Sequence, residues 1–182
     1  RLKAALIEIR KYTETDPIVF VPKIQELCAD SGVVVVFIKE IPGTRTFGVT
    51  RWLSPQKALI QLSSRYKTND HFWFTFFHEA GHILNNGKRE SFFECEDSDG
   101  ELENLANQFA ANFLIDPKLY TWLRKELKNK KGFISTEFIR DSARKIGVAP
   151  GIIVGRLQHD GLLSHNYLNQ LKRVYDWSTL MK

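Results

Sequence analysis

The sequence has few cysteines and no long hydrophobic run, and each absence excludes a class of protein. Its 182 residues contain only Cys28 and Cys95, too few for a disulfide framework, which indicates reduced thiols in the cytoplasm. No uninterrupted apolar run approaches the ~20 residues that a membrane-spanning helix requires. The first stretch, RLKAALIEIRKY, is too highly charged for a signal peptide. We therefore expect a cytoplasmic protein without a membrane segment.

The chain also lacks an initiator methionine, because its first residue is Arg1. This start indicates a part of a longer protein. A chain of 182 residues suffices for one well-buried core but not for two ordinary domains, so residues 1–182 are expected to form a single domain. The net charge of +5 would suit a nucleic-acid neighbour, but solvated Lys and Arg side chains explain it equally well.

The most informative stretch is HFWFTFFHEAGHILNN, residues 71–86, which contains the pattern HExxH at His78, Glu79 and His82. Four residues of α-helix turn the chain by about 400°, so the two imidazoles lie on one face, a turn apart. Both rings can then bind one metal ion, with Glu79 close enough to act on a water beside it. The stretch is apolar nearly all round, which predicts a buried helix. Burying two His and a Glu is costly unless something satisfies them, and a zinc ion would.

The same pattern has a second explanation. In a chain of this composition, HExxH arises by chance in about one per cent of sequences. Two core histidines bonded to backbone carbonyls would then need no metal. The low chance frequency and the apolar surroundings favour the metal site.

Hydrophobic periodicity predicts an α+β fold. Residues 1–31 are expected to form two helices, the second with Pro22 in its first turn. Residues 33–66 are expected to form a small, largely antiparallel, three-stranded sheet. Residues 68–115 would carry the helices of the metal site, and residues 117–182 a set of C-terminal helices. The strands are expected at 33–38, 46–53 and 57–65. The predicted architecture is this sheet packed on a mainly helical core that contains the buried HExxH helix.

A second helix, predicted from Glu101 to Ile115, can supply the third protein ligand that an HExxH zinc site requires. Glu103 is the candidate, and Asn107, one turn further on, can orient a ligand from behind it. Standing alone, Glu103 is explained equally well as an exposed first-turn Glu near a positive helix N-terminus. The HExxH pattern upstream favours the ligand. The apolar stripe of this helix is expected to comprise Leu102, Leu105, Ala106, Phe109 and Phe113.

Residues 138–161 resemble a DNA-binding helix-turn-helix, with small, glycine and branched residues at the positions that the motif prefers. Its second helix would offer only Arg156, Gln158 and His159 to a groove, a poor set for reading bases. We therefore expect this helix pair to pack within the fold. Apolar residues spaced three and four apart at 168–175 predict a further amphipathic helix.

These motifs together resemble those of the ImmA/IrrE family of metallopeptidases. The matching segments are DHFWFTFF, HEAGH, ENLANQFAANFLIDP and APGIIVGRLQHDGLL, at 70–77, 78–82, 103–117 and 149–163. The resemblance implies a zincin-like core in which His78 and His82 bind zinc, Glu79 is the catalytic base and Glu103 is the family's Glu ligand. Asn107 stands where related sites often carry Asp, which implies weaker support of a ligand His and a lower metal affinity. Many members carry an N-terminal helix-turn-helix domain, so contact with DNA is expected only through such a domain outside this chain.

The resemblance also implies cleavage of repressor or regulator proteins in the bacterial cytoplasm, in mobile-element and stress responses. The first hypothesis is therefore a zinc-dependent endopeptidase whose substrate strand adds to a sheet edge, with 57–65 as the candidate. His159 is a candidate for stabilising the oxyanion, and a satisfied interdomain or surface His is the alternative. The second hypothesis is a metal- or partner-sensing regulatory domain of a DNA-binding transcription factor with little turnover. The third is a scaffold without metal. The sequence does not separate the first two.

Overall fold

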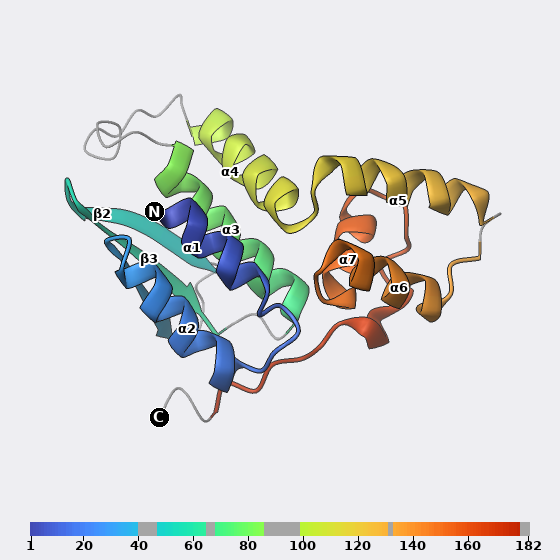
Figure 1. The fold of residues 1–182 in the computed structure, drawn as a ribbon, viewed down its shortest axis with the longest axis horizontal. Coiled ribbons are helices and arrows are strands. Elements are labelled where there is room, and N and C mark those ends of the chain that lie inside the picture. The colour runs from blue at the N-terminus through green and yellow to red at the C-terminus, as the bar shows by residue number, and fades with distance from the viewer. Residues whose placement is uncertain (40–46, 65–67, 86–98, 131–132, 179–182) are drawn as a thin grey trace.

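The structure is a computed structural model that describes residues 1–39, 47–64, 68–85, 99–130 and 133–178 (Figure 1). Its elements confirm the predicted α+β class. In chain order they are α1 (Leu2–Arg10), α2 (Pro17–Ala29), β1 (Val33–Ile38), β2 (Gly48–Ser54), β3 (Lys57–Ser63), α3 (Asn69–Asn85), α4 (Asp99–Leu114), α5 (Pro117–Asn129), α6 (Thr136–Ile146), α7 (Pro150–His159) and the 3-10 helix η2 (Asn169–Leu171).

The three strands form a mixed sheet in the order β1-β3-β2. β2 and β3 pair antiparallel, but β1 and β3 pair in parallel. The prediction was a largely antiparallel sheet, and the observed sheet is mixed. The reason is that β3, rather than β2, takes the central place, and β2 runs against both other strands. Ala58, Ile60 and Leu62 of β3 are at most 1% exposed, as expected of a central strand with one face on the core.

Helix α3 packs against both the sheet and two other helices. It contacts β2 and β3, lies against α4, and meets α7 near its N-terminal end (Figure 1). Its side chains Phe72, Trp73, Phe76 and Phe77 are at most 1% exposed, which confirms the predicted buried helix. Trp73 Nε1 also donates to the Tyr175 hydroxyl at 2.9 Å. This aromatic packing fixes the turns that precede the HExxH pattern.

The second helix begins earlier than predicted, at Pro17, with Asp16 as its N-cap residue. Pro22 therefore lies inside the helix, and the expectation that it occupies the first turn is wrong. Pro17 takes the first helical position, where a missing N–H costs least. Phe20 and Ile24 are fully buried on either side of Pro22, and such tertiary packing outweighs one lost backbone hydrogen bond.

The predicted C-terminal amphipathic helix is also wrong. Residues 168–178 form only η2, followed by extended chain in which Val174 bridges to Thr68. The backbone groups that a helix would use turn instead to the start of α3, because Asn69 N donates to Arg173 O at 2.8 Å. The apolar residues face the core nonetheless. The buried ones are Leu168, Leu171, Tyr175 and Trp177.

Helices α6 and α7 pack within the fold, as predicted for the segment that resembles a helix-turn-helix. Ile153, Val154 and Leu157 of α7 are fully buried. Gln158 is also buried, and its amide nitrogen, with two N–H groups to donate, lies 3.1–3.2 Å from the carbonyl oxygens of residues 164, 165 and 167. Of the three side chains considered for a groove, Gln158 is thus occupied within the fold and Arg156 is mostly covered, so only His159 is largely exposed.

Arg10 connects α1 to two other helices. Its guanidinium donates to the carbonyl oxygen of Leu114 at 2.7 and 3.0 Å and to that of Ile146 at 2.8 Å. Leu114 is the last residue of α4, and Ile146 is the last of α6. One side chain thus satisfies carbonyl groups at both helix C-termini, where no intrahelical donor is available.

Cys28 belongs to α2, and its side chain is fully buried in the hydrophobic core. Burial raises the pKa of its thiol to about 12, so the thiol stays protonated and unreactive. Cys95 lies outside the described residues.

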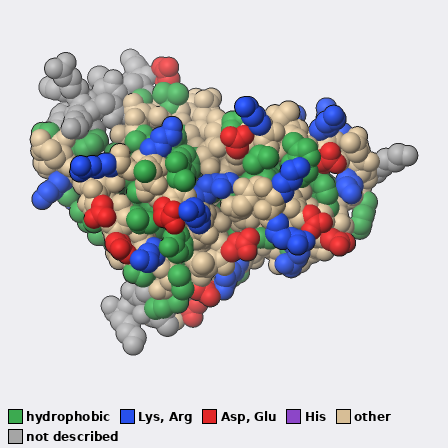
Figure 2. Space-filling model, in the orientation of Figure 1, with side chains coloured by type: hydrophobic (Ala, Val, Ile, Leu, Met, Phe, Trp, Pro, Cys, Tyr) green, Lys and Arg blue, Asp and Glu red, His purple; other side chains and the backbone are tan. Residues whose placement is uncertain are grey.

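The surface carries charges of both signs. Lys and Arg side chains are interspersed with Asp and Glu over the face drawn in Figure 2. This mixture matches the interpretation of the net charge as solvated surface residues. In the described part of the chain, no helix combines the length and the apolar character needed to cross a membrane.

Candidate metal centre

Helices α3 and α4 approach each other closely beside the HExxH pattern. A Cβ atom on Gly81 would lie 3.2 Å from the Cα of Ala106 and 3.1 Å from the ring of Phe109, so a larger residue there would require α4 to move by a few tenths of an ångström. Leu105, expected in the core stripe, is instead 42% exposed. The buried side of α4 passes through its neighbour Ala106 and through Ala110, which are fully buried. Because Gly81 and Ala106 are small, the two helices approach closely and the Glu103 side chain can contact residues of α3.

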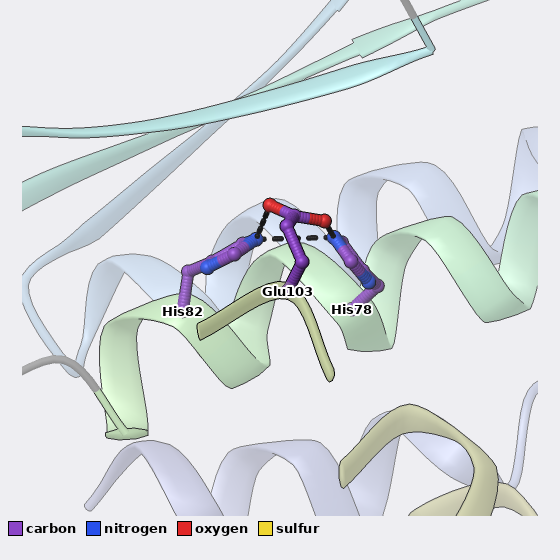
Figure 3. Close-up of side chains that lie close together, drawn as sticks. All are labelled: His78, His82 and Glu103. Atoms are coloured by element: carbon purple, nitrogen blue, oxygen red, sulfur yellow. Dashed lines mark hydrogen bonds and ion pairs between the residues drawn. The ribbon is translucent and has the colours of Figure 1, made fainter. Parts of the chain in front are cut away.

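Three side chains converge above this contact, His78 and His82 from α3 and Glu103 from α4 (Figure 3). The Nε2 atoms of the two histidines are 3.0 Å apart. The Glu103 carboxylate reaches both, with Oε2 at 3.3 Å from His78 Nε2 and Oε1 at 3.1 Å from His82 Nε2. The candidates named from the sequence therefore meet, although they lie on different helices.

These separations fit a bound metal ion. Nitrogen and oxygen ligands of tetrahedral zinc lie at about 2.0–2.2 Å from the ion, which sets them roughly 3.3–3.6 Å from one another. The separations of 3.0, 3.1 and 3.3 Å here are within a few tenths of an ångström of that range. Two imidazoles and a carboxylate are also a donor set that suits zinc. A small movement apart would accommodate the ion.

The hydrogen bonds around the histidines favour the form that binds metal. His78 Nδ1 lies 2.9 Å from Asn107 Oδ1. An amide oxygen only accepts, so Nδ1 carries the proton and the Nε2 lone pair faces the other two side chains. Burial, and then the neighbouring His78, lower the pKa of His82, although Glu103 acts in the opposite direction. A neutral imidazole is the form that coordinates a metal.

Glu79 lies next to these side chains, between α3 and β2, and is 6% exposed. Its Oε2 accepts a hydrogen bond from Thr50 Oγ1 at 2.6 Å. The same hydroxyl is 3.0 Å from the Glu79 carbonyl oxygen, but it has a single proton, and the carboxylate is the nearer and stronger acceptor. A Cβ on Gly48 would lie 2.5 Å from Glu79 Oε1, so the glycine leaves the space that the carboxylate fills. Burial raises the pKa of Glu79, whereas the bond from Thr50 lowers it.

Gly48 and Thr50 were not predicted from the sequence to lie at this site. The alternation along β2 places both on one face of the strand, and this is the only local signal. Which helix that face meets is decided by contacts across 29 positions, the separation of Thr50 and Glu79.

Two other residues considered from the sequence lie apart from the converging side chains. Glu101 is exposed in the first turns of α4 and does not belong to the group that could hold a metal. The side chain of His159 is 81% exposed, with Nδ1 3.0 Å from Asp160 Oδ1. It is therefore a surface histidine with a carboxylate partner, the other option considered for it.

Comparison with known families gives a match. The model of a peptidase family, described as the IrrE N-terminal-like domain, matches residues 28–145. This span is more than half of the chain, and it contains β2, the HExxH pattern and Glu103. A comparison with curated proteins finds no match.

Proposed function

The chain belongs to the peptidase family described as IrrE N-terminal-like, and from this premise we propose that it is a zinc-dependent endopeptidase cleaving a cytoplasmic regulator or repressor protein. One observation carries the proposal. The ligand atoms of His78, His82 and Glu103 converge at nearly the spacing of a tetrahedral site, with the buried carboxylate of Glu79 beside them. Three protein ligands leave a fourth position open, which distinguishes a catalytic zinc site from a structural one.

Each residue then has a defined task. Zinc bound by the three ligands would polarise the scissile carbonyl and lower the pKa of a water from about 15.7 towards ~7. Glu79 would accept a proton from the attacking water and deliver it to the leaving amine. Burial supports this task because a raised pKa makes the carboxylate a stronger base. Thr50 would hold the carboxylate in place, and Asn107 would hold the His78 ring.

The substrate backbone would add to β2. The prediction that the substrate adds to residues 57–65 is wrong, because β3 lies in the centre of the sheet and is paired on both sides. β2 is an edge strand, and it carries Gly48 and Thr50 beside Glu79. An extended peptide hydrogen-bonded to this edge would pass directly by the converging ligands.

A comparison of protein N-termini in cells tests the regulatory substrate. Cells that express the unaltered protein and cells that express Glu79→Gln would be compared for new N-termini. A regulator or repressor cut only in the first culture supports the proposal. Equal N-terminal profiles, together with a zinc-loaded purified protein, would favour the metal- or partner-sensing regulatory domain instead.

The purified protein is expected to carry about one zinc ion per chain, because its donor set and ligand count suit this ion. Elemental analysis after gentle purification measures the stoichiometry. A protein that is free of metal and also fails to take up added zinc would contradict both the peptidase and the metal-sensing hypotheses.

Thr50→Val is expected to lower kcat by about 10-fold with little change in KM, because it removes a hydrogen bond to a buried carboxylate worth about 1.5 kcal/mol. Valine has nearly the same shape as threonine, so the fold is preserved. Thr50→Ser keeps the hydroxyl and is the matched control, with activity close to that of the unaltered protein. If Thr50→Ser were as slow as Thr50→Val, the hydroxyl would not be the group that positions Glu79.

A further inference from the structure

A cavity of about 630 Å³ lies next to the metal centre, between α3, α4 and α7. His71, Phe74 and Thr75 line it from α3, and Asn107 and Ala111 are among its residues on α4. Such a volume exceeds that of any single side chain, and it lies within the range of sites that bind small molecules or peptide segments.

The cavity lies along the same faces of α3 and α4 as the candidate ligands. On α3, His71, Phe74 and His78 follow one another at helical spacing, so all three lie along one face. On α4, Asn107 and Ala111 follow Glu103 at intervals of four residues. Asn107 belongs to both places, because it lines the cavity and bonds to His78 Nδ1 at 2.9 Å. The ring of Phe74 is likewise 6.2 Å from that of His78, centroid to centroid. A chain bound at the metal centre can therefore extend a side chain into the cavity.

Asn104, Asn107 and Gln108 line the end of the cavity near Glu103, and the apolar part of the lining lies further along the helices. Phe74, with Ala111 and Ile115 of the α4 end and Ile152 of α7, supplies hydrocarbon and aromatic surface. Such a surface stabilises a bound group roughly in proportion to the apolar area that it removes from water.

The cations that line the cavity already have carboxylate partners. Lys172 Nζ lies 2.6 Å from Asp70 Oδ2, and both side chains are nearly buried. Arg156 Nε lies 3.0 Å from Asp160 Oδ2, and its guanidinium also stacks over the Tyr120 ring at 4.4 Å. Since these charges are compensated, they give little net attraction for an acidic group, and the lining favours an apolar occupant.

We propose that this cavity is the specificity pocket of the enzyme, which binds a bulky apolar side chain of the substrate residue next to the scissile bond. The proposal rests on the proposed peptidase function and adds the class of residue that the site selects. One wall, formed by Ile152 and Gly155 of α7, lies beyond the residues that the family model matches. The selectivity would therefore depend in part on α7, which the family model does not cover.

Three hydroxamates of one peptide scaffold test the proposal on the zinc-loaded, unaltered protein. Their hydroxamate group binds zinc, and they differ only in the side group next to it, which is isobutyl, hydrogen or 4-aminobutyl. Calorimetry measures the affinity of each. The isobutyl compound is expected to bind about 10- to 100-fold more tightly than the hydrogen compound, the gain expected from burying one leucine-sized side chain.

A pair of variants on α4 locates the side group. Ala111→Phe fills the cavity and should reduce the preference for isobutyl to less than about threefold, without a change in zinc content. Asn112→Phe adds the same side chain at the neighbouring exposed position, outside the cavity, and should leave the preference intact. A preference that survives in a folded Ala111→Phe protein would overturn the assignment of the cavity.

The outcomes separate the two proposals. If zinc binds and the isobutyl and hydrogen compounds have equal affinity, or the 4-aminobutyl compound binds best, the apolar pocket is overturned while the peptidase proposal stands. If the protein takes up no zinc and no hydroxamate binds, the peptidase proposal fails and the pocket assignment fails with it.

Discussion

Glu79→Gln is expected to reduce peptide hydrolysis by about 10²–10⁴-fold while the fold and the zinc content stay unchanged. Gln is nearly isosteric with Glu, so it still fits the space opposite Gly48, and its amide oxygen can still accept the bond from Thr50. The amide cannot accept a proton from water, however, and this is the step that is lost. Glu79 does not belong to the three converging side chains, so zinc should remain. The measurements are turnover of a peptide substrate and zinc per chain.

The matched control for this variant is Glu101→Gln. It makes the same chemical change at an exposed Glu outside the converging group, and should alter neither turnover nor zinc content. Unchanged cleavage by Glu79→Gln would remove Glu79 from the mechanism. Loss of zinc from this variant would instead assign Glu79 to the metal.

Glu103→Ala is expected to weaken zinc binding by more than about 100-fold, because removing a group that only supports a ligand already costs 10- to 100-fold. The Glu103 carboxylate lies 3.1–3.3 Å from the Nε2 atoms of both His82 and His78, so its loss leaves two protein ligands. The side chain is exposed enough for alanine to be tolerated, and the fold should persist.

Zinc affinity in competition with a chelating dye measures this effect. Glu101→Ala is the control, because residues two apart on a helix point roughly 200° away from each other and only Glu103 can face α3. Its zinc affinity should be nearly that of the unaltered protein. If Glu101→Ala lost the metal and Glu103→Ala retained it, the assignment of the third ligand would be wrong.

The parts of the site that could be predicted from the sequence are those that obey local rules. The spacing of His78 and His82 fixes a common helix face, and the apolar residues around them require burial. The candidate for a third ligand, Glu103, needed one further step, which is a chemical argument about the number of protein ligands that zinc requires. Helix starts with strong caps were equally accessible, as at Asp116, whose carboxylate accepts from Lys118 N.

The features that escaped prediction depend on contacts between distant parts of the chain. β-branched and alternating residues indicate strands but not their order, so the parallel pairing of β1 with β3 could not be foreseen. The spacing of Leu168, Leu171 and Tyr175 fits a helix, yet hydrogen bonds to the start of α3 hold that segment extended. The contact of Thr50 with Glu79 has the same character, since it follows from where β2 docks.

The three hydrogen bonds of Arg10 have a mechanical consequence for the metal centre. Helix α4 carries Glu103 near one end, and its other end, at Leu114, is held by this guanidinium together with the end of α6. Separating α4 from α6 would leave half-buried carbonyl groups unpaired, at about 1–3 kcal/mol each. Helix α4 therefore cannot shift along its axis without loss of its hydrogen bonds to Arg10. The hydrogen bonds of Arg10 therefore limit how far Glu103 can move from His78 and His82.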